Sequence, residues 1–71
     1  MATTYEVQGR RTERDPDGKS RAVVRLDTAD SRTAAFAVAD TMGAEKLTAR
    51  VFMTRRRAGR TSYKLLGVVQ A

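Results

Sequence analysis

The 71-residue chain contains no cysteine, no histidine and no tryptophan, and a single proline. Without cysteine it has no disulfides, thiolate metal sites or cysteine nucleophile, and without histidine it lacks the commonest general base and metal ligand. The serines have no histidine partner and no nucleophile-elbow motif, and no glycine-rich phosphate-binding motif is present. We therefore expect a protein that is not an enzyme and that holds no metal or cofactor.

Long apolar runs are also missing. No stretch approaches the roughly 18 consecutive apolar residues of a membrane span. The first residues lack the basic and apolar regions of a signal peptide. We expect a cytoplasmic protein with no membrane partner, in which residues 1–71 form one small basic domain, because a chain of this length buries only a modest core.

The positive charge is unevenly distributed. The chain has 14 Lys and Arg against 8 Asp and Glu, for a net charge of +6. Residues 1–45 hold seven cations and all eight anions, whereas residues 46–71 hold seven cations and no anion. A genome rich in G and C also favours arginine codons, but this asymmetry indicates a surface that faces an anionic partner.

The first third of the sequence predicts a β-hairpin. Residues 4–12 alternate in period two, with Tyr5 and Val7 on one side, and residues 20–27 alternate as well. The inner side of the second strand is expected to carry Ala22, Val24 and Leu26. Between the strands, residues 15–18 read Asp-Pro-Asp-Gly, the pattern of a tight turn. A calcium loop is disfavoured because its further ligands are missing.

A helix is expected from Asp30 to Gly43. Asp30 is a good N-cap residue, and Gly43 suits the left-handed position that ends a helix. Four apolar residues recur at helical spacing and would pack on a sheet: Ala35, Val38, Ala39 and Met42. Phe36 lies at the margin of this stripe.

Two further strands follow the helix. Residues 47–54 alternate, and their inner side is expected to carry Leu47, Ala49, Val51 and Met53. Residues 55–60 are expected to form a loop with Gly59 at its bend. In residues 61–70 the expected inner set is Tyr63, Leu65 and Val69. The run 65–69 is apolar on both faces, which is typical of a central strand or of one covered by another chain.

These elements predict an α+β fold with the order β-β-α-β-β, in which one helix covers one face of a four-stranded, mainly antiparallel sheet. The second face of the sheet is then open. By the alternation above, it should carry Gln8, Arg10, Arg21, Val23, Arg25, Arg50, Phe52, Thr54, Lys64, Leu66 and Val68.

This expected face is both basic and partly apolar, which favours nucleic-acid binding. Arginine beside an aromatic ring can neutralise phosphates and stack on bases. The loop with Arg55, Arg56, Arg57 and Arg60 adds four guanidinium groups that can bind phosphate. We predict that the protein binds DNA or RNA through nine residues: Arg21, Arg25, Arg50, Phe52, Arg55, Arg56, Arg57, Arg60 and Lys64.

Other interpretations of the same residues stay open. The cations would fit an acidic protein surface equally well, or they would form a solvated tip that blunts strand pairing. The apolar residues of the open face would suit a homodimer interface. The alternative function is therefore a protein-protein interaction module or modulator.

The stretch from Tyr5-x-Val-x-Gly-Arg through Asp-Thr-Ala-Asp30 to Met-Gly43 resembles the small β-β-α-β proteins of uncertain function found in high-GC bacteria and their phages and plasmids. The resemblance covers over half of the chain. It implies an accessory protein of a mobile element, but it carries over no functional residue, and the arginine-rich C-terminal hairpin has no counterpart in it.

Overall fold

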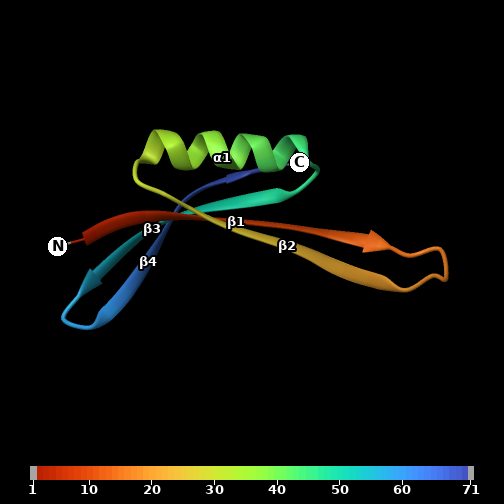
Figure 1. The fold of residues 1–71 in the computed structure, drawn as a ribbon, viewed down its shortest axis with the longest axis horizontal. Coiled ribbons are helices and arrows are strands. Elements are labelled where there is room, and N and C mark those ends of the chain that lie inside the picture. The colour runs from red at the N-terminus through yellow and green to blue at the C-terminus, as the bar shows by residue number, and fades with distance from the viewer. Residues whose placement is uncertain (1, 71) are drawn as a thin grey trace.

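A computed structural model describes residues 2–70 and shows one sheet covered on one face by one helix (Figure 1). The elements are β1 (Ala2–Arg14), β2 (Ser20–Ala29), α1 (Arg32–Ala44), β3 (Thr48–Arg57) and β4 (Arg60–Val69). All neighbouring strands are antiparallel, in the order β2-β1-β3-β4. The α+β class and the β-β-α-β-β order predicted from the sequence are confirmed.

The first hairpin forms as its turn residues predict. The Gly18 amide donates to the Asp15 carbonyl at 2.9 Å, and the Asp15 amide donates to the Lys19 carbonyl at 2.7 Å. Gly18 adopts a φ of +86°, which glycine takes without steric cost. The hairpin extends well past the end of α1 (Figure 1).

The second hairpin is tighter than the sequence predicts. Strand pairing between β3 and β4 continues as far as Arg57 opposite Arg60, so only Ala58 and Gly59 form the turn. Both have positive φ, +51° and +76°, as in a type I′ turn, whose twist matches that of the flanking strands. The predicted six-residue loop over 55–60 is therefore wrong, and the arginines on either side of the turn belong to a two-stranded ribbon.

The helix begins one residue later than predicted. Ser31, and not Asp30, is the N-cap residue, and its hydroxyl accepts a hydrogen bond from the Ala34 amide at 3.1 Å. A Ser hydroxyl satisfies a free first-turn amide as well as an Asp carboxylate does, so the sequence did not distinguish the two neighbours.

The helix also ends later than predicted, because Gly43 lies inside it. The left-handed residue is Lys46, with a φ of +69°. The Lys46 amide donates to the Gly43 carbonyl at 3.0 Å, and the Leu47 amide donates to the Met42 carbonyl at 2.9 Å. These two bonds form a Schellman motif, and the buried Leu47 and Met42 side chains add its usual apolar contact.

The core lies between α1 and the two central strands. Its fully buried residues are Val7, Ala35, Ala39, Met42, Leu47, Ala49 and Val51. A Cβ atom on Gly9 would lie 2.7 Å from the Met42 sulfur, and one on Gly67 would lie 3.1 Å from the Phe36 ring. The helix therefore approaches the sheet over two glycines, and the predicted inner sets of β1, β3 and the helix are confirmed.

The predicted orientation of β2 is wrong. The register places Arg25 opposite Gly9 and Val23 opposite Arg11, which puts these two β2 residues on the helix side. Val24 and Leu26 point the other way, 65% and 61% exposed. Because side chains alternate strictly along a strand, a register error of one residue exchanges the two faces.

The predicted inner set of β4 is wrong for Tyr63 and Leu65, and only Val69 lies inward as expected. A bulge between Val51 and Phe52 shifts the β3–β4 register, so Phe52 lies opposite Leu65 while Val51 lies opposite Gly67. The skipped residue, Leu66, packs against the core. Since a bulge adds one residue to one strand, every side chain before it changes face.

We expect Gly9 of β1 and Gly43 of α1 to respond oppositely to an added methyl group. Gly9→Ala should lower the free energy of unfolding by about 1–3 kcal/mol, because the methyl group would overlap Met42. Gly43→Ala should raise it by about 0.5–1 kcal/mol, because Gly43 lies in the helix and its added Cβ would meet Val69 at 3.4 Å and the Gln70 carbonyl oxygen at 3.7 Å, both without overlap. Thermal melts followed by circular dichroism measure both, and equal shifts for the two variants would contradict the packing described.

Candidate nucleic-acid interface

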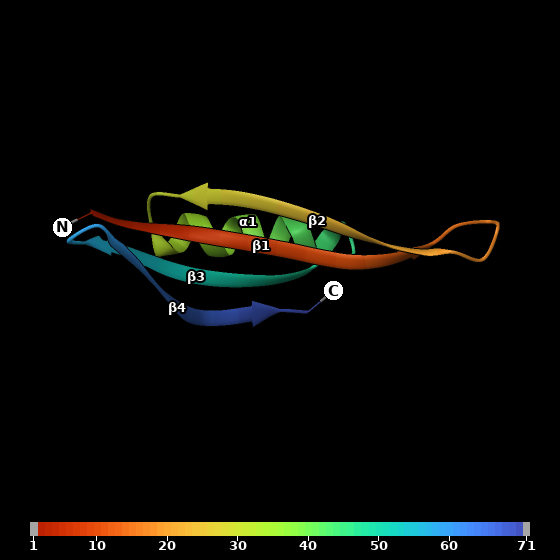
Figure 2. The same ribbon diagram turned by 90° about the horizontal axis from the view of Figure 1, so that it is seen from below.

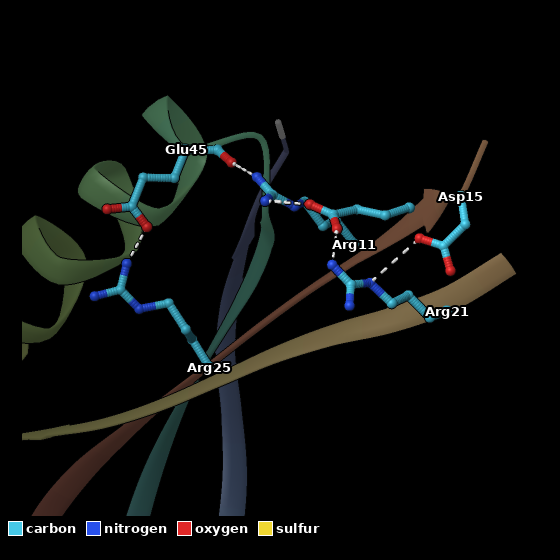
Figure 3. Close-up of polar contacts among 6 residues, drawn as sticks. Arg11, Asp15, Arg21, Arg25 and Glu45 are labelled. Carbon is cyan, nitrogen blue, oxygen red and sulfur yellow. Dashed lines mark hydrogen bonds and ion pairs between the residues drawn. The ribbon is translucent and has the colours of Figure 1, made fainter.

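On the helix side, the arm formed by β1 and β2 carries a chain of ion pairs (Figure 3). The Glu13 carboxylate accepts from Arg11 at 2.5 Å and from Arg21 at 3.1 Å, and Arg21 also lies 3.9 Å from Asp15. The hydrogen bonds from Arg21 and then Arg11 lower the pKa of the Glu13 carboxyl below its ordinary value. Arg11 and Arg21, on the helix side of this arm, are thus matched with carboxylates.

A second ion pair connects the C-terminal end of the helix to β2. Arg25 donates to the Glu45 carboxylate, which raises the pKa of the Arg25 guanidinium (Figure 3). Arg11 donates to the Glu45 backbone carbonyl at 2.6 Å, so a cation satisfies one of the free carbonyls at the C-terminal end of the helix.

Three residues of the predicted site lie on the wrong face for it. Arg21 and Arg25 lie on the helix side of β2, where they form the ion pairs above, because the β2 register is offset by one residue from the predicted one. Lys64 lies opposite Met53 on the helix side of the β3–β4 ribbon, because of the bulge. The prediction that these three share the open face with Phe52 is wrong.

Figure 2 shows the open face of the sheet in front of the helix. The exposed large apolar side chains lie on this face. Register and alternation place on it Glu6, Gln8 and Arg10 of β1, Val24 and Leu26 of β2, Arg50, Phe52 and Thr54 of β3, and Tyr63, Leu65 and Val68 of β4. The large hydrophobic residues that are most exposed are all among them: Val24, Leu26, Tyr63, Leu65 and Val68. A polar band from β1 and β3 runs between the apolar edges.

Two aromatic rings meet on this face. Phe52 and Tyr63 pack edge to face, with centroids 6.4 Å apart and ring planes at 89°. Tyr63 is 60% exposed, whereas Phe52 is half-buried. Sequence reasoning found Phe52 but assigned Tyr63 to the core, since the bulge that turns it outward leaves no clear mark in the alternation of β4. The available signal was that apolar residues occupy both faces of the alternation in β4.

The remaining arginines of the predicted site are exposed along the β3–β4 ribbon. Alternation places Arg50 and Arg56 on the open-face side, and Arg55, Arg57 and Arg60 on the other side. Among residues 2–70, none of these five forms an ion pair, in contrast to Arg11, Arg21 and Arg25 on the helix side of β1 and β2. The structure therefore divides the predicted arginine cluster between both sides of one ribbon.

A shallow hollow of about 540 Å³ lies on the open face, where β3 begins and the sheet narrows toward the arm. Six of its lining residues share the open face: Gln8, Arg10, Thr12, Val24, Thr48 and Arg50. The hollow could not be predicted from the sequence, since it depends on where β3 begins relative to β1.

No protein-family model, curated protein or solved structure matches this chain. In the described part of the chain, no helix is long and apolar enough to cross a membrane. Within the same residues, no three acidic side chains come together in a way that could hold a metal ion.

The ion pairs of Glu13 predict how stability depends on pH. A carboxyl whose pKa is lowered by folding contributes stability above its unfolded pKa of about 4.3 and loses that contribution as the pH falls through its lower, folded pKa. We expect Glu13→Gln to melt below the wild type at pH 7 and the difference to vanish in strong acid. The matched control is Glu6→Gln, which removes a carboxylate that forms no ion pair among the described residues, and it should change the melt less. A Glu13→Gln difference that stays constant from pH 7 to pH 2 would contradict the role given to these pairs.

Proposed function

We propose that this protein is a non-enzymatic nucleic-acid-binding module of the cytoplasm that uses the β3–β4 ribbon and the open face. The observation that carries the proposal is a contrast within one small molecule. On the helix side of the β1–β2 arm, Arg11, Arg21 and Arg25 are paired with carboxylates. The cations of the β3–β4 ribbon are exposed, without ion pairs among residues 2–70, and they flank the exposed Tyr63 ring and the half-buried Phe52 ring.

The charge of the ribbon suits a phosphate backbone. The sequence from Lys46 onward contains no acidic residue, so nothing within this segment repels phosphate. Guanidinium groups bind phosphate through paired N–H donors, and arginines on both sides of a narrow ribbon can contact a backbone that bends around it. The released counterions supply the affinity, which needs no recognition of sequence.

The aromatic pair suits the bases. Sheet surfaces that bind nucleic acids stack bases on aromatic rings and place cations beside them. Tyr63 supplies an exposed ring next to Phe52, and Arg50 lies two residues along β3 on the same face. Phosphate and base contacts are then available within a few residues of each other.

A second function is favoured by a different observation. Val24, Leu26, Leu65 and Val68 are exposed on the open face, and exposed apolar patches of this kind mark protein contacts. The alternative is therefore a protein-protein interaction module, either a homodimer or a modulator of another protein with an acidic surface, as a phage or plasmid accessory protein would be.

The arginines beside the second turn provide the decisive variant. Replacing Arg55, Arg56 and Arg57 by Ala should leave the melt nearly unchanged, because these side chains are exposed. It should flatten the slope of log K against log salt by about three times 0.7 to 0.9 if each contacts one phosphate. Fluorescence anisotropy with labelled oligonucleotides measures this slope.

The matched control removes the same charge elsewhere, by replacing Arg14, Lys19 and Arg32 with Ala. Equal losses in both triple variants would mean that only net charge matters, and would contradict a binding surface on the ribbon. Absence of binding to any oligonucleotide at low salt would overturn the nucleic-acid proposal. A dimer mass in light scattering would then favour the alternative.

A further inference from the structure

The hollow on the open face has the chemistry of a phosphate site. Arg10 and Arg50 both line it, and the Gln8 amide with the Thr12 and Thr48 hydroxyls supplies neutral donors around them. Of the residues that the structure describes, no carboxylate lines the hollow. The third arginine of the lining, Arg11, pairs with Glu13 on the helix side. Arg10 and Arg50 form no ion pair within residues 2–70, and two such guanidinium groups in one concave site favour an anion with several oxygen acceptors.

Strand pairing explains why the two arginines converge. Gln8 lies opposite Arg50 and Arg10 lies opposite Thr48, so Arg10 and Arg50 are diagonal neighbours on the same face of β1 and β3. Diagonal neighbours across antiparallel strands are about 7–8 Å apart at their Cα atoms, within reach of one ligand for side chains of this length. Val24, opposite Arg10 on β2, closes the apolar side of the hollow.

The hollow and the aromatic pair are adjacent. Arg50 and Phe52 lie on the same face of β3, two residues apart, which is about 7 Å along a strand. The carboxylate of Glu6 lies opposite Phe52, on the same face. The Glu6 carboxylate repels a phosphate but not a neutral base. The charges of this face therefore favour a phosphate in the hollow and a base against Phe52 and Tyr63.

We propose that the ligand of the open face is a single strand, DNA or RNA, with one phosphate in the hollow between Arg10 and Arg50 and the neighbouring base against Tyr63 and Phe52. This inference rests on the proposed nucleic-acid function and specifies its ligand. A duplex keeps its base faces stacked inside the helix, so it offers phosphates to the hollow but no base to the rings. A single strand offers both.

The first test compares affinities by anisotropy, using labelled U12, labelled dT12 and a labelled 12-base-pair DNA duplex at low salt. Arg10→Gln and Arg50→Gln should each weaken binding to the single strands roughly tenfold and reduce the salt slope by about 0.7. The matched control is Arg14→Gln, which removes a cation from the same face of β1 outside the hollow and should change affinity less than twofold. The U12 and dT12 arms decide whether the strand is RNA, DNA or either.

The second test observes stacking directly. The chain contains two tyrosines and no tryptophan, and Tyr5 packs on the helix side, so Tyr5→Phe leaves Tyr63 as the sole tyrosine fluorophore. Saturating this variant with U12 or dT12 should quench its fluorescence, whereas the duplex should leave it unchanged. A further Tyr63→Leu exchange should weaken single-strand binding by roughly tenfold with little effect on the melt, because Tyr63 is 60% exposed.

The outcomes separate the two proposals. This inference would be overturned if the duplex bound as tightly as the single strands and if Arg10→Gln and Arg50→Gln weakened binding no more than Arg14→Gln does. The proposed function would still stand if the triple Ala variant of Arg55, Arg56 and Arg57 lost salt dependence. Binding without quenching of Tyr63 would also overturn it. Absence of binding to all three oligonucleotides would overturn the proposed function itself.

Discussion

Gly9 allows α1 to lie directly against β1, and this close contact determines which surfaces of the sheet are covered. Ala35 and Ala39 are fully buried on the facing side of the helix, and a methyl group on Gly9 would overlap Met42. A single 13-residue helix held this closely covers one face of the central strands and nothing more. The second face and the ends of both hairpins are left to solvent, and these surfaces carry the proposed function.

The sequence predicted the parts of the fold that local chemistry determines. Turn residues located both hairpins, and helical spacing located the buried stripe. Alternation oriented β1 and β3, because all their large apolar residues except Phe52 lie on one face. The faces of β2 and β4 depended on register instead. In β2, Val23 and Val24 are equally suited to a core, and the turn with its pairing to β1 decides between them. In β4, the bulge at Val51 and Phe52 decides, and it is a property of two paired strands.

The same dependence on register governed the candidate site. Phe52 and Arg50 lie on the face that alternation along β3 predicted, whereas Arg56 was predicted to lie in a loop. Arg21, Arg25 and Lys64 lie on the opposite face from the predicted one, since each belongs to a strand whose face was decided by pairing. The exposed position of Tyr63 and the hollow were missed because both depend on strand pairing. The outward orientation of Tyr63 depends on the bulge, and the hollow depends on the offset between the ends of β1 and β3.

Topology explains why the ribbon keeps its positive charge. All the acidic residues precede Lys46, so the carboxylates lie on β1, β2, the helix and their connections. The order β2-β1-β3-β4 places β2 and β4 at opposite edges, which removes the β2 carboxylates from the reach of β4. On β1, Glu13 lies beyond the last residue paired with β3, and there it pairs with Arg11 and Arg21. Glu6, on the open face, is the β1 carboxylate that lies directly opposite β3, and its neighbour there is Phe52. The arrangement that stabilises the arm therefore leaves the arginines of the ribbon without acidic partners within the described residues, and an external anion is the partner that this charge distribution favours.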